Sequence, residues 1–147
     1  MKILNTDFHY DTETYQAICT LTDPASNLSW RGYATCHPND LDMESERTGM
    51  HIAETRALIK VLKAERREVK IKIKEITDFY NGLKDSKKIV VTTDYVMGKI
   101  RSRLGALNDE LREVNEEITY LQFSLNDYIK SKDELYHKIR KLRSNHA

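Results

Sequence analysis

The sequence predicts an α+β fold, with a small N-terminal antiparallel β-sheet of about three strands followed by two long antiparallel α-helices. Two patterns support this fold. Up to about residue 37, apolar residues alternate with polar ones, as in half-buried strands. Beyond residue 44 they recur at steps of four and three, as in helices paired along one seam. We expect residues 1–43 to form the sheet and residues 44–147 a helical hairpin with a coiled-coil-like oligomerisation region, together in a single structural unit.

The first two strands are expected to form a hairpin, because the runs "ILNTDFHY" and "TYQAICTL" are separated by a turn at residues 11–13. The run "LSWRGYATC" follows the turn at Asp23 and Pro24 and forms the third strand. Its alternation places four residues on one face of the sheet, namely Trp30, Gly32, Ala34 and Cys36. A sheet of about 35 residues cannot bury enough apolar surface alone, so one face must be covered.

The first helix is expected from about residue 45 to residue 84. Asn81 and Gly82 provide a C-terminal stop. The N-cap of the next helix is expected at Thr92, Thr93 or Asp94. The seam positions of the first helix are Ile52, Thr55, Ile59, Leu62, Arg66, Val69, Ile73, Ile76, Tyr80 and Leu83.

The seam of the second helix is the strongest pattern in the sequence. It gives a rod of about 43 residues and about 65 Å. Because a lone two-helix hairpin would expose Phe79, Tyr120 and Phe123, we expect a homodimer or a higher oligomer such as a hexamer. The seam residues are Ile100, Leu104, Leu107, Leu111, Val114, Ile118, Leu121, Leu125 and Tyr128, and after Lys132 the spacing resumes at Leu135, Ile139 and Leu142.

Composition favours a cytoplasmic protein. Cys19 and Cys36 are too few for a disulfide framework, and the first residues have no apolar core like that of a signal peptide. No stretch approaches the roughly 20 apolar residues of a membrane span. The formal net charge of +1 creates no strong field that would attract nucleic acid or membrane.

Catalytic and metal-binding patterns are absent from the sequence. Cys36 and His37 are neighbours, but adjacent strand residues point to opposite faces, and no CxxC or HxxxH spacing accompanies them. No Ser-His-Asp spacing, Walker loop or GxGxxG is present. We therefore expect no enzymatic activity, no metal and no cofactor.

Three segments could bind an anion. The "SERTG" turn precedes the first helix, where Arg47 and Arg56 could contact phosphate, although Glu44 and Glu46 favour plain helix capping. Residues 60–74 contain seven basic residues.

We expect the charges of residues 60–74 to surround the helix instead of forming one stripe, and we expect Ile71 and Ile73 between them to need burial. The near-neutral total charge makes nucleic acid the least favoured partner. The third segment sets Arg101 and Arg103 near Tyr95, at the start of a helix, where the helix dipole disfavours cations. A bound anion would compensate for that misfit.

The run "WRGYATCHPNDLDMESERTGMHIAETRALIKVLK" and the tail "LREVNEEITYLQFSLNDYIKSKDELYHKIRKL" resemble the Thoeris anti-defence sponge family of small phage-encoded proteins. The resemblance implies a non-catalytic, oligomeric viral protein in the host cytoplasm, with an N-terminal sheet and C-terminal helices. It implies that such a protein sequesters a cyclic nucleotide signal, either the cyclic ADP-ribose isomer made by bacterial TIR enzymes or a cyclic oligonucleotide.

A cyclic nucleotide presents phosphates, an adenine face and ribose hydroxyls, for which arginine, aromatic and amide side chains are suitable partners. Each candidate could equally be structural, and Trp30 in particular is a more typical core residue than a stacking platform. The alternative function is a protein–protein interaction module without a small ligand. The candidate residues are Arg31, Arg56, Arg101 and Arg103 for phosphate, Trp30, Tyr80 and Tyr95 for stacking, and Asn81 for a ribose or base edge.

Overall fold

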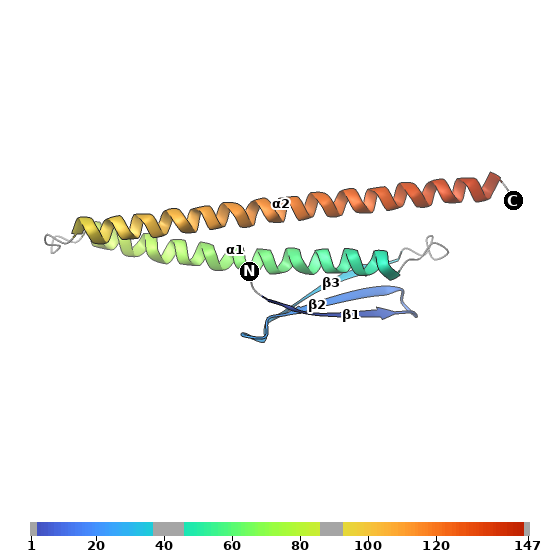
Figure 1. Ribbon diagram of the computed structural model, residues 1–147, viewed down its shortest axis with the longest axis horizontal. Helices are drawn as coiled ribbons and strands as arrows, with labels where there is room; N and C mark the ends of the chain where they lie inside the picture. Colours follow the sequence, from blue (N-terminus) through green and yellow to red (C-terminus); the bar gives the residue numbers. More distant parts are fainter. Residues whose placement is uncertain (1–2, 37–45, 86–92, 146–147) are drawn as a thin grey trace. The chain divides into compact units, whose positions relative to one another are not determined.

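The computed structural model describes residues 3–36, 46–85 and 93–145 and confirms the α+β fold (Figure 1). Three strands are followed by two long helices. The elements are β1 (Asn5–Asp11), β2 (Gln16–Thr22), β3 (Ser29–Thr35), α1 (Glu46–Asp85) and α2 (Thr93–Asn145).

The chain divides into two compact units, and both helices contribute to each. Unit 1 comprises Met1–Val61 and Thr119–Ala147, and unit 2 comprises Leu62–Ile118. The division therefore runs across the two helices.

The three strands form an antiparallel sheet in the order β1-β2-β3. Cys19 in the central strand pairs with Phe8 of β1 and Gly32 of β3. Ala17, Cys19 and Leu21 are buried, which confirms the predicted alternation along β2. The opposite face of the sheet has Arg31 and Tyr33 in exposed positions of β3, and Thr20 in a half-buried position of β2.

Aspartate side chains hold both turns of the sheet. In the β1–β2 turn, Asp11 Oδ1 accepts hydrogen bonds from the backbone N–H groups of Glu13 at 2.8 Å and Thr14 at 3.4 Å. In the β2–β3 turn, Asp23 Oδ1 accepts from the backbone N–H of Ala25 at 3.0 Å. Such side-chain bonds replace backbone partners that a turn lacks, and they favour Asp at these positions.

The inner face of the sheet packs directly on the first half of α1. A Cβ atom on Gly32 would lie 1.9 Å from the carbonyl oxygen of Ala53 and 2.6 Å from the backbone nitrogen of Ala57, so the strand and helix backbones meet where only glycine fits. Val61 completes the α1 side of the shared core. The expectation that one face of the sheet needs a cover is met within the same chain.

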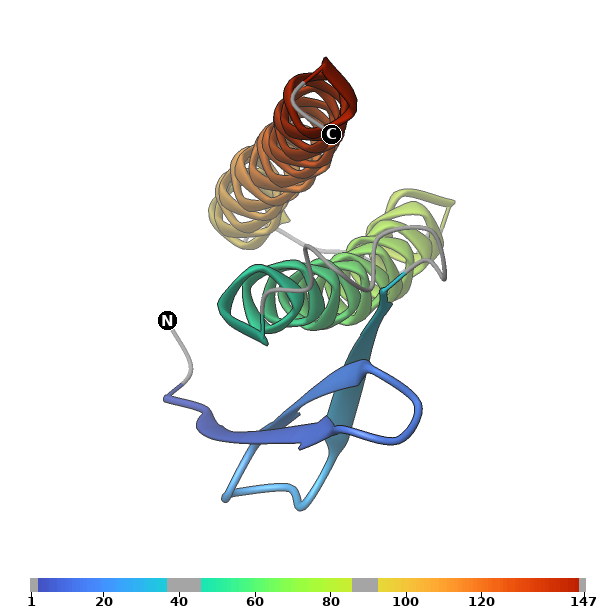
Figure 2. The ribbon, with the colours of Figure 1, turned by 90° about the vertical axis from the view of Figure 1, so that its right-hand side faces the viewer.

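Unit 1 has three layers, with the sheet and the C-terminal half of α2 on opposite sides of α1 (Figure 2). Across the α1–α2 contact, the His51 and Tyr128 rings lie 4.4 Å apart, centre to centre, at an angle of 59°. In unit 2, Arg66 Nη1 donates to Asn115 Oδ1 at 3.4 Å. Both contacts belong to antiparallel helices, as predicted. Much of each predicted seam is buried, including Thr55, Ile59, Leu62 and Val69 on α1 and Leu107, Val114, Ile118 and Leu125 on α2.

Helix α1 spans Glu46–Asp85, within one residue of the predicted ends at about residues 45 and 84, although the stop expected at Asn81 and Gly82 lies inside it. Helix α1 continues through Asn81 and Gly82 to Asp85, because Gly82 does not adopt the positive φ angle of a helix-ending glycine. Helix α2 begins at Thr93, within the predicted range, and its 53 residues exceed the predicted 43. His37, Glu44 and Thr92 lie outside the described residues.

The last part of the predicted α2 seam is not buried. Leu135 is 46% exposed and Leu142 is 59% exposed. The reason is the position of the α1 start: Tyr128 already faces His51, only five residues after α1 begins at Glu46. Within the described part of unit 1, the final turns of α2 therefore have no helix beside their seam. None of the described helices combines the length and apolar character needed to cross a membrane.

Candidate functional site

The eight predicted site residues fall into two groups, one in each unit. Three belong to unit 1, namely Trp30, Arg31 and Arg56. Five belong to unit 2, namely Tyr80, Asn81, Tyr95, Arg101 and Arg103. Each group is considered by itself.

Trp30 lies on the inner face of the sheet, opposite Leu21 of β2. It is half-buried and packs against the core shared with α1. A stacking site needs an open ring face, whereas this ring contributes to burial of the sheet. Trp30 therefore has a structural role in this geometry.

Arg56 and Lys60 connect α1 to the outer edge of β3. Arg56 Nη1 donates to the Tyr33 carbonyl oxygen at 2.6 Å, and Lys60 Nζ donates to the Arg31 carbonyl oxygen at 2.5 Å. Lys60 Nζ also lies 5.5 Å from the centre of the Tyr33 ring. Because no strand of the described chain pairs with β3 on this side, the two cations satisfy carbonyls that another chain could otherwise pair with. The Arg31 guanidinium itself is exposed and has no hydrogen bond or ion pair to the described residues.

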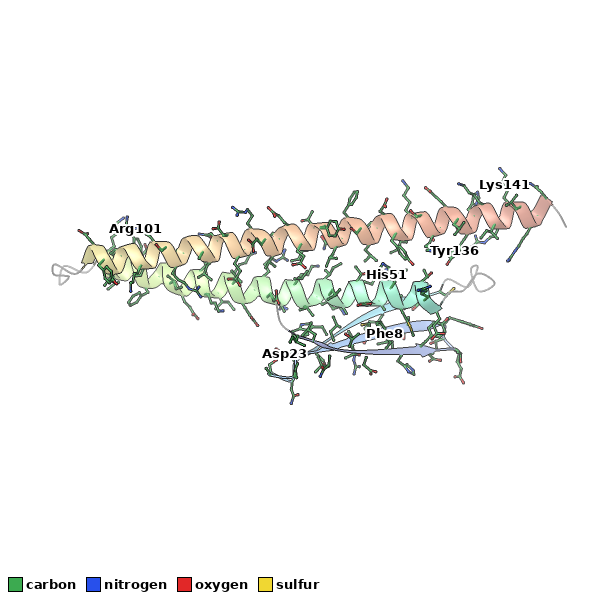
Figure 3. All side chains as sticks on the ribbon, viewed as in Figure 1. Phe8, Asp23, His51, Arg101, Tyr136 and Lys141 are labelled. Carbon is green, nitrogen blue, oxygen red and sulfur yellow. The ribbon has the colours of Figure 1, made fainter. Side chains whose placement is uncertain are left out.

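In unit 2, Tyr95 is 70% exposed, and Lys99 Nζ lies 4.7 Å from the centre of its ring. At about 100° per residue, Arg103 lies about 80° around α2 from Tyr95, whereas Arg101 lies about 120° away in the other direction. Arg101 Nε donates to the Met97 carbonyl oxygen at 3.4 Å, and Arg101 lies near the start of α2 (Figure 3). Tyr95, Lys99 and Arg103 can therefore share a ligand on α2, and Arg101 cannot join them on the same face.

Tyr80 and Asn81 lie near the end of α1, where Tyr80 is half-buried in the seam and Asn81 is exposed. Among the residues that the structure describes in unit 2, no hydrogen bond or ion pair links these two side chains to Tyr95, Arg101 or Arg103. The hydrogen bonds and ion pairs of the described residues do not connect the five predicted residues of unit 2 to one another.

The basic residues of segment 60–74 lie on more than one side of α1: Arg66 reaches α2, and exposed Lys72 lies on another face of the helix. Four of the seven basic residues follow one another at steps of four, three and four along α1 in unit 2, and all four are exposed. These four form one row on one face of the helix. We name it the basic row, and it consists of Lys63, Arg67, Lys70 and Lys74.

The helical period of these four positions is the sequence signal that identifies the row. Arg66 is instead a seam residue, and Ile71, which was expected to need burial, is 57% exposed.

The two cysteines differ in burial, since Cys19 is buried and Cys36 is half-buried. Cys19 is fully buried, and burial, together with the negative charges of Glu54 and Asp7, raises the pKa of its thiol to about 11. A thiol that remains protonated at neutral pH is a poor nucleophile. No cluster of three or more His, Cys, Asp or Glu side chains suited to a metal ion occurs in residues 3–36, 46–85 and 93–145.

Large apolar side chains are exposed on both helices, as predicted. The most exposed pair of neighbouring aromatic side chains lies in unit 1, where Tyr120 is 68% exposed and Phe123 is 72% exposed. They are three residues apart on one side of α2, while Leu125 in the seam is buried. We name this pair the aromatic patch.

Comparisons of the chain with protein-family models, curated proteins and solved structures find no match. The resemblance to the Thoeris sponge family remains a prediction from the sequence.

Proposed function

We propose that the chain is a non-catalytic protein–protein interaction module that associates with a second copy of itself through α2. The observation that carries this proposal is the aromatic patch. Two aromatic side chains about 70% exposed on one helix face are costly to leave in water.

A second copy suits the patch because a two-fold axis presents the same surface from both sides. In an antiparallel pair of α2 helices, Tyr120 of each copy meets Phe123 of the other, which gives two equivalent aromatic contacts. Asp127 and Lys130 follow within two turns and provide one charge of each sign, so a second copy is not repelled.

The area of the patch limits the strength of this association. Two aromatic side chains of about 200 Å² each, mostly exposed, bury about 300 Å² per copy, whereas a standard interface buries about 800 Å² per partner. The contact must therefore extend along α2, and we expect a dissociation constant in the micromolar range, about 1–100 µM.

The test compares three proteins by size-exclusion chromatography with light scattering. The wild type should show a mass that rises with concentration, and the double variant Tyr120→Ser, Phe123→Ser should remain a monomer. A matched control, Gln122→Ser with Asn126→Ser, changes two exposed residues of the same turns and should behave as the wild type. Equal masses for all three proteins at every concentration would refute the proposal.

A second candidate function is sequestration of a cyclic nucleotide, in line with the sequence resemblance. The arrangement that favours it is the exposed Tyr95 ring with Lys99 beside it and Arg103 on a neighbouring face of α2. An adenine could stack on the ring while the two cations contact phosphate.

Native mass spectrometry tests this second candidate with a cyclic ADP-ribose isomer and with a cyclic dinucleotide. The expected result is a ligand-bound mass that Tyr95→Ala and Arg103→Gln abolish and Arg112→Gln retains. Heating the complex should return the nucleotide intact. Absence of a bound mass would exclude sequestration of these ligands, and an altered nucleotide would indicate an enzyme.

A further inference from the structure

The basic row presents its cations on a single exposed face of α1 in unit 2. From Lys63 to Lys74 it extends about 16 Å, with successive cations about 5–6 Å apart along the helix axis. Row positions at steps of four and three stay on one face of a helix. The row is therefore a linear array of positive charge.

Most of this charge is not neutralised within the described residues. Lys63, Arg67 and Lys70 have no hydrogen bond or ion pair to the rest of the described chain. Lys74 is paired with Asp78, with a separation of 2.9 Å between Nζ and Oδ2, but both side chains are largely exposed. Such surface pairs contribute little and exchange readily for another anion.

The adjacent side of α2 in unit 2 adds no competing acid. Arg66 reaches α2 at Asn115, an amide, and Asn108 occupies the same helical position one heptad earlier. Two nearby acids of α2, Asp109 and Glu116, are held by Arg112 at 3.4 Å and 4.0 Å. The α2 side chain that Arg66 contacts is thus neutral, and Asp78 is the acid that contacts the row.

We propose that the basic row binds the phosphate backbone of a duplex nucleic acid without reading its sequence. A duplex presents a dense and regular line of negative charge, with one charge per about 1.7 Å of its axis. Lysine and arginine side chains on long stems can reach successive phosphates from one helix face. A protein partner fits less well, because lysines are depleted from protein interfaces and the four positions of the row contain no aromatic side chain.

This inference is independent of the aromatic patch, which lies in unit 1 on α2. Four phosphate contacts correspond to a slope of about −3.6 when the logarithm of the association constant is plotted against the logarithm of the salt concentration. Binding should be weak, in the range of about 10⁻⁴ to 10⁻⁶ M.

The experiment measures fluorescence anisotropy of labelled 20-base-pair DNA duplexes of two unrelated sequences, and of one RNA duplex, with the full-length chain. The wild type should bind both DNA sequences equally, and binding should weaken about 10²-fold between about 50 and 200 mM salt. The variant Lys63→Gln, Arg67→Gln, Lys70→Gln should lose about three units of salt slope. The RNA arm shows whether the row accepts both kinds of duplex or DNA alone.

A matched control changes three exposed lysines outside the row and outside the contact proposed for a second copy, and it alters the net charge equally: Lys72→Gln, Lys138→Gln and Lys141→Gln. The control should keep the wild-type slope. An equal loss of salt slope in the row variant and in the control, or no duplex binding by the wild type at low salt, would overturn the proposal. If the wild type binds no duplex, and the row variant differs from it in apparent molecular mass when no duplex is present, the proposal is overturned. The row would then be assigned to contact with a second copy. Circular dichroism of each variant confirms that its helices are intact.

Discussion

The α-carbon of Gly32 faces the carbonyl of Ala53 so closely that a Cβ atom on Gly32 would lie 1.9 Å from that oxygen. No side-chain adjustment can relieve such an overlap, because both partners are backbone. The contact fixes how the sheet lies on α1 and makes one glycine essential to unit 1.

Substitution Gly32→Ala should therefore destabilise the protein by about 3 kcal/mol or more, since strand and helix must separate. Gly105→Ala on α2 is the matched control, because its Cβ would meet no atom within 4 Å. The control should stabilise α2 by about 0.5–1 kcal/mol, the usual advantage of alanine over glycine in a helix. Urea unfolding measures both changes. Similar stability for Gly32→Ala and the wild type would contradict the packing described.

The carboxylate of Asp11 should make the β1–β2 turn sensitive to acid. Hydrogen bonds from the Glu13 and Thr14 backbones and from the Thr14 side chain hold its pKa below the ordinary value of 3.8. The pKa of Asp11 is lower in the folded chain than in the unfolded chain, where it has the ordinary value of 3.8. The stabilisation is therefore fully present above about pH 4 and is lost as the pH falls through 3.8 toward the folded pKa.

Asp11→Asn keeps an acceptor oxygen for the turn but has no charge to titrate. Its urea midpoint should fall less between pH 5 and pH 3 than that of the wild type, whereas Asp11→Ala should be weaker at both pH values. Identical acid dependence of the wild type and Asp11→Asn would show that this carboxylate does not contribute.

The Cys19 thiol should be unreactive in the folded protein. Its pKa of about 11, raised from 9.0 by burial and by Glu54 and Asp7, leaves almost no thiolate at pH 8. In a Cys36→Ser variant, a thiol reagent should modify Cys19 rapidly in urea and very slowly without it. Rapid modification of the native variant would contradict burial of this side chain.

The same pKa shift predicts a loss of stability in alkali. The pKa of Cys19 is higher in the folded chain than in the unfolded chain, where it has the ordinary value of 9.0. The stabilising contribution of the protonated thiol is therefore present below pH 9.0 and is lost as the pH rises from there toward 11. Replacing Cys19 with Ala should remove this part of the pH dependence. Unfolding midpoints at pH 8 and pH 10 measure the difference, and an unchanged alkaline loss in Cys19→Ala would assign it to other groups.

Burial along α2 predicts opposite outcomes for two seam leucines. Leu107 is 1% exposed, and Leu107→Ala should cost about 2–5 kcal/mol by leaving a cavity. Leu142 is 59% exposed, and Leu142→Ala should change stability by less than about 0.5 kcal/mol. Urea unfolding of the two variants distinguishes a seam that is buried along its whole length from one that ends near Tyr128.

Periodicity explains why the strands and the helical seam could be predicted from sequence. The two-residue alternation of Ala17, Cys19 and Leu21 and the seven-residue repeat through Leu107 and Val114 are local patterns, and burial follows them. The extent of α1 was predicted to within one residue, although Gly82 itself does not end the helix, because its backbone does not adopt the positive φ angle of a helix-ending glycine.

The candidate site was less predictable, because its residues depend on tertiary contacts. Nothing in the sequence near Arg56 indicates that its guanidinium reaches the Tyr33 carbonyl, 23 residues away. Trp30 is more typical of a core than of a stacking site, and in the structure its ring packs against the core shared with α1. The basic row, by contrast, is a local helical pattern, because its steps of four and three lie within a segment already expected to be a helix.

Sedimentation equilibrium of the unmodified chain tests the central claim most directly, namely that the aromatic patch drives self-association. The apparent mass should rise from 17.2 kDa toward twice that value as the concentration increases, and the rise should persist at high salt, because apolar contacts are not screened. A mass that stays at 17.2 kDa at every concentration would contradict the account.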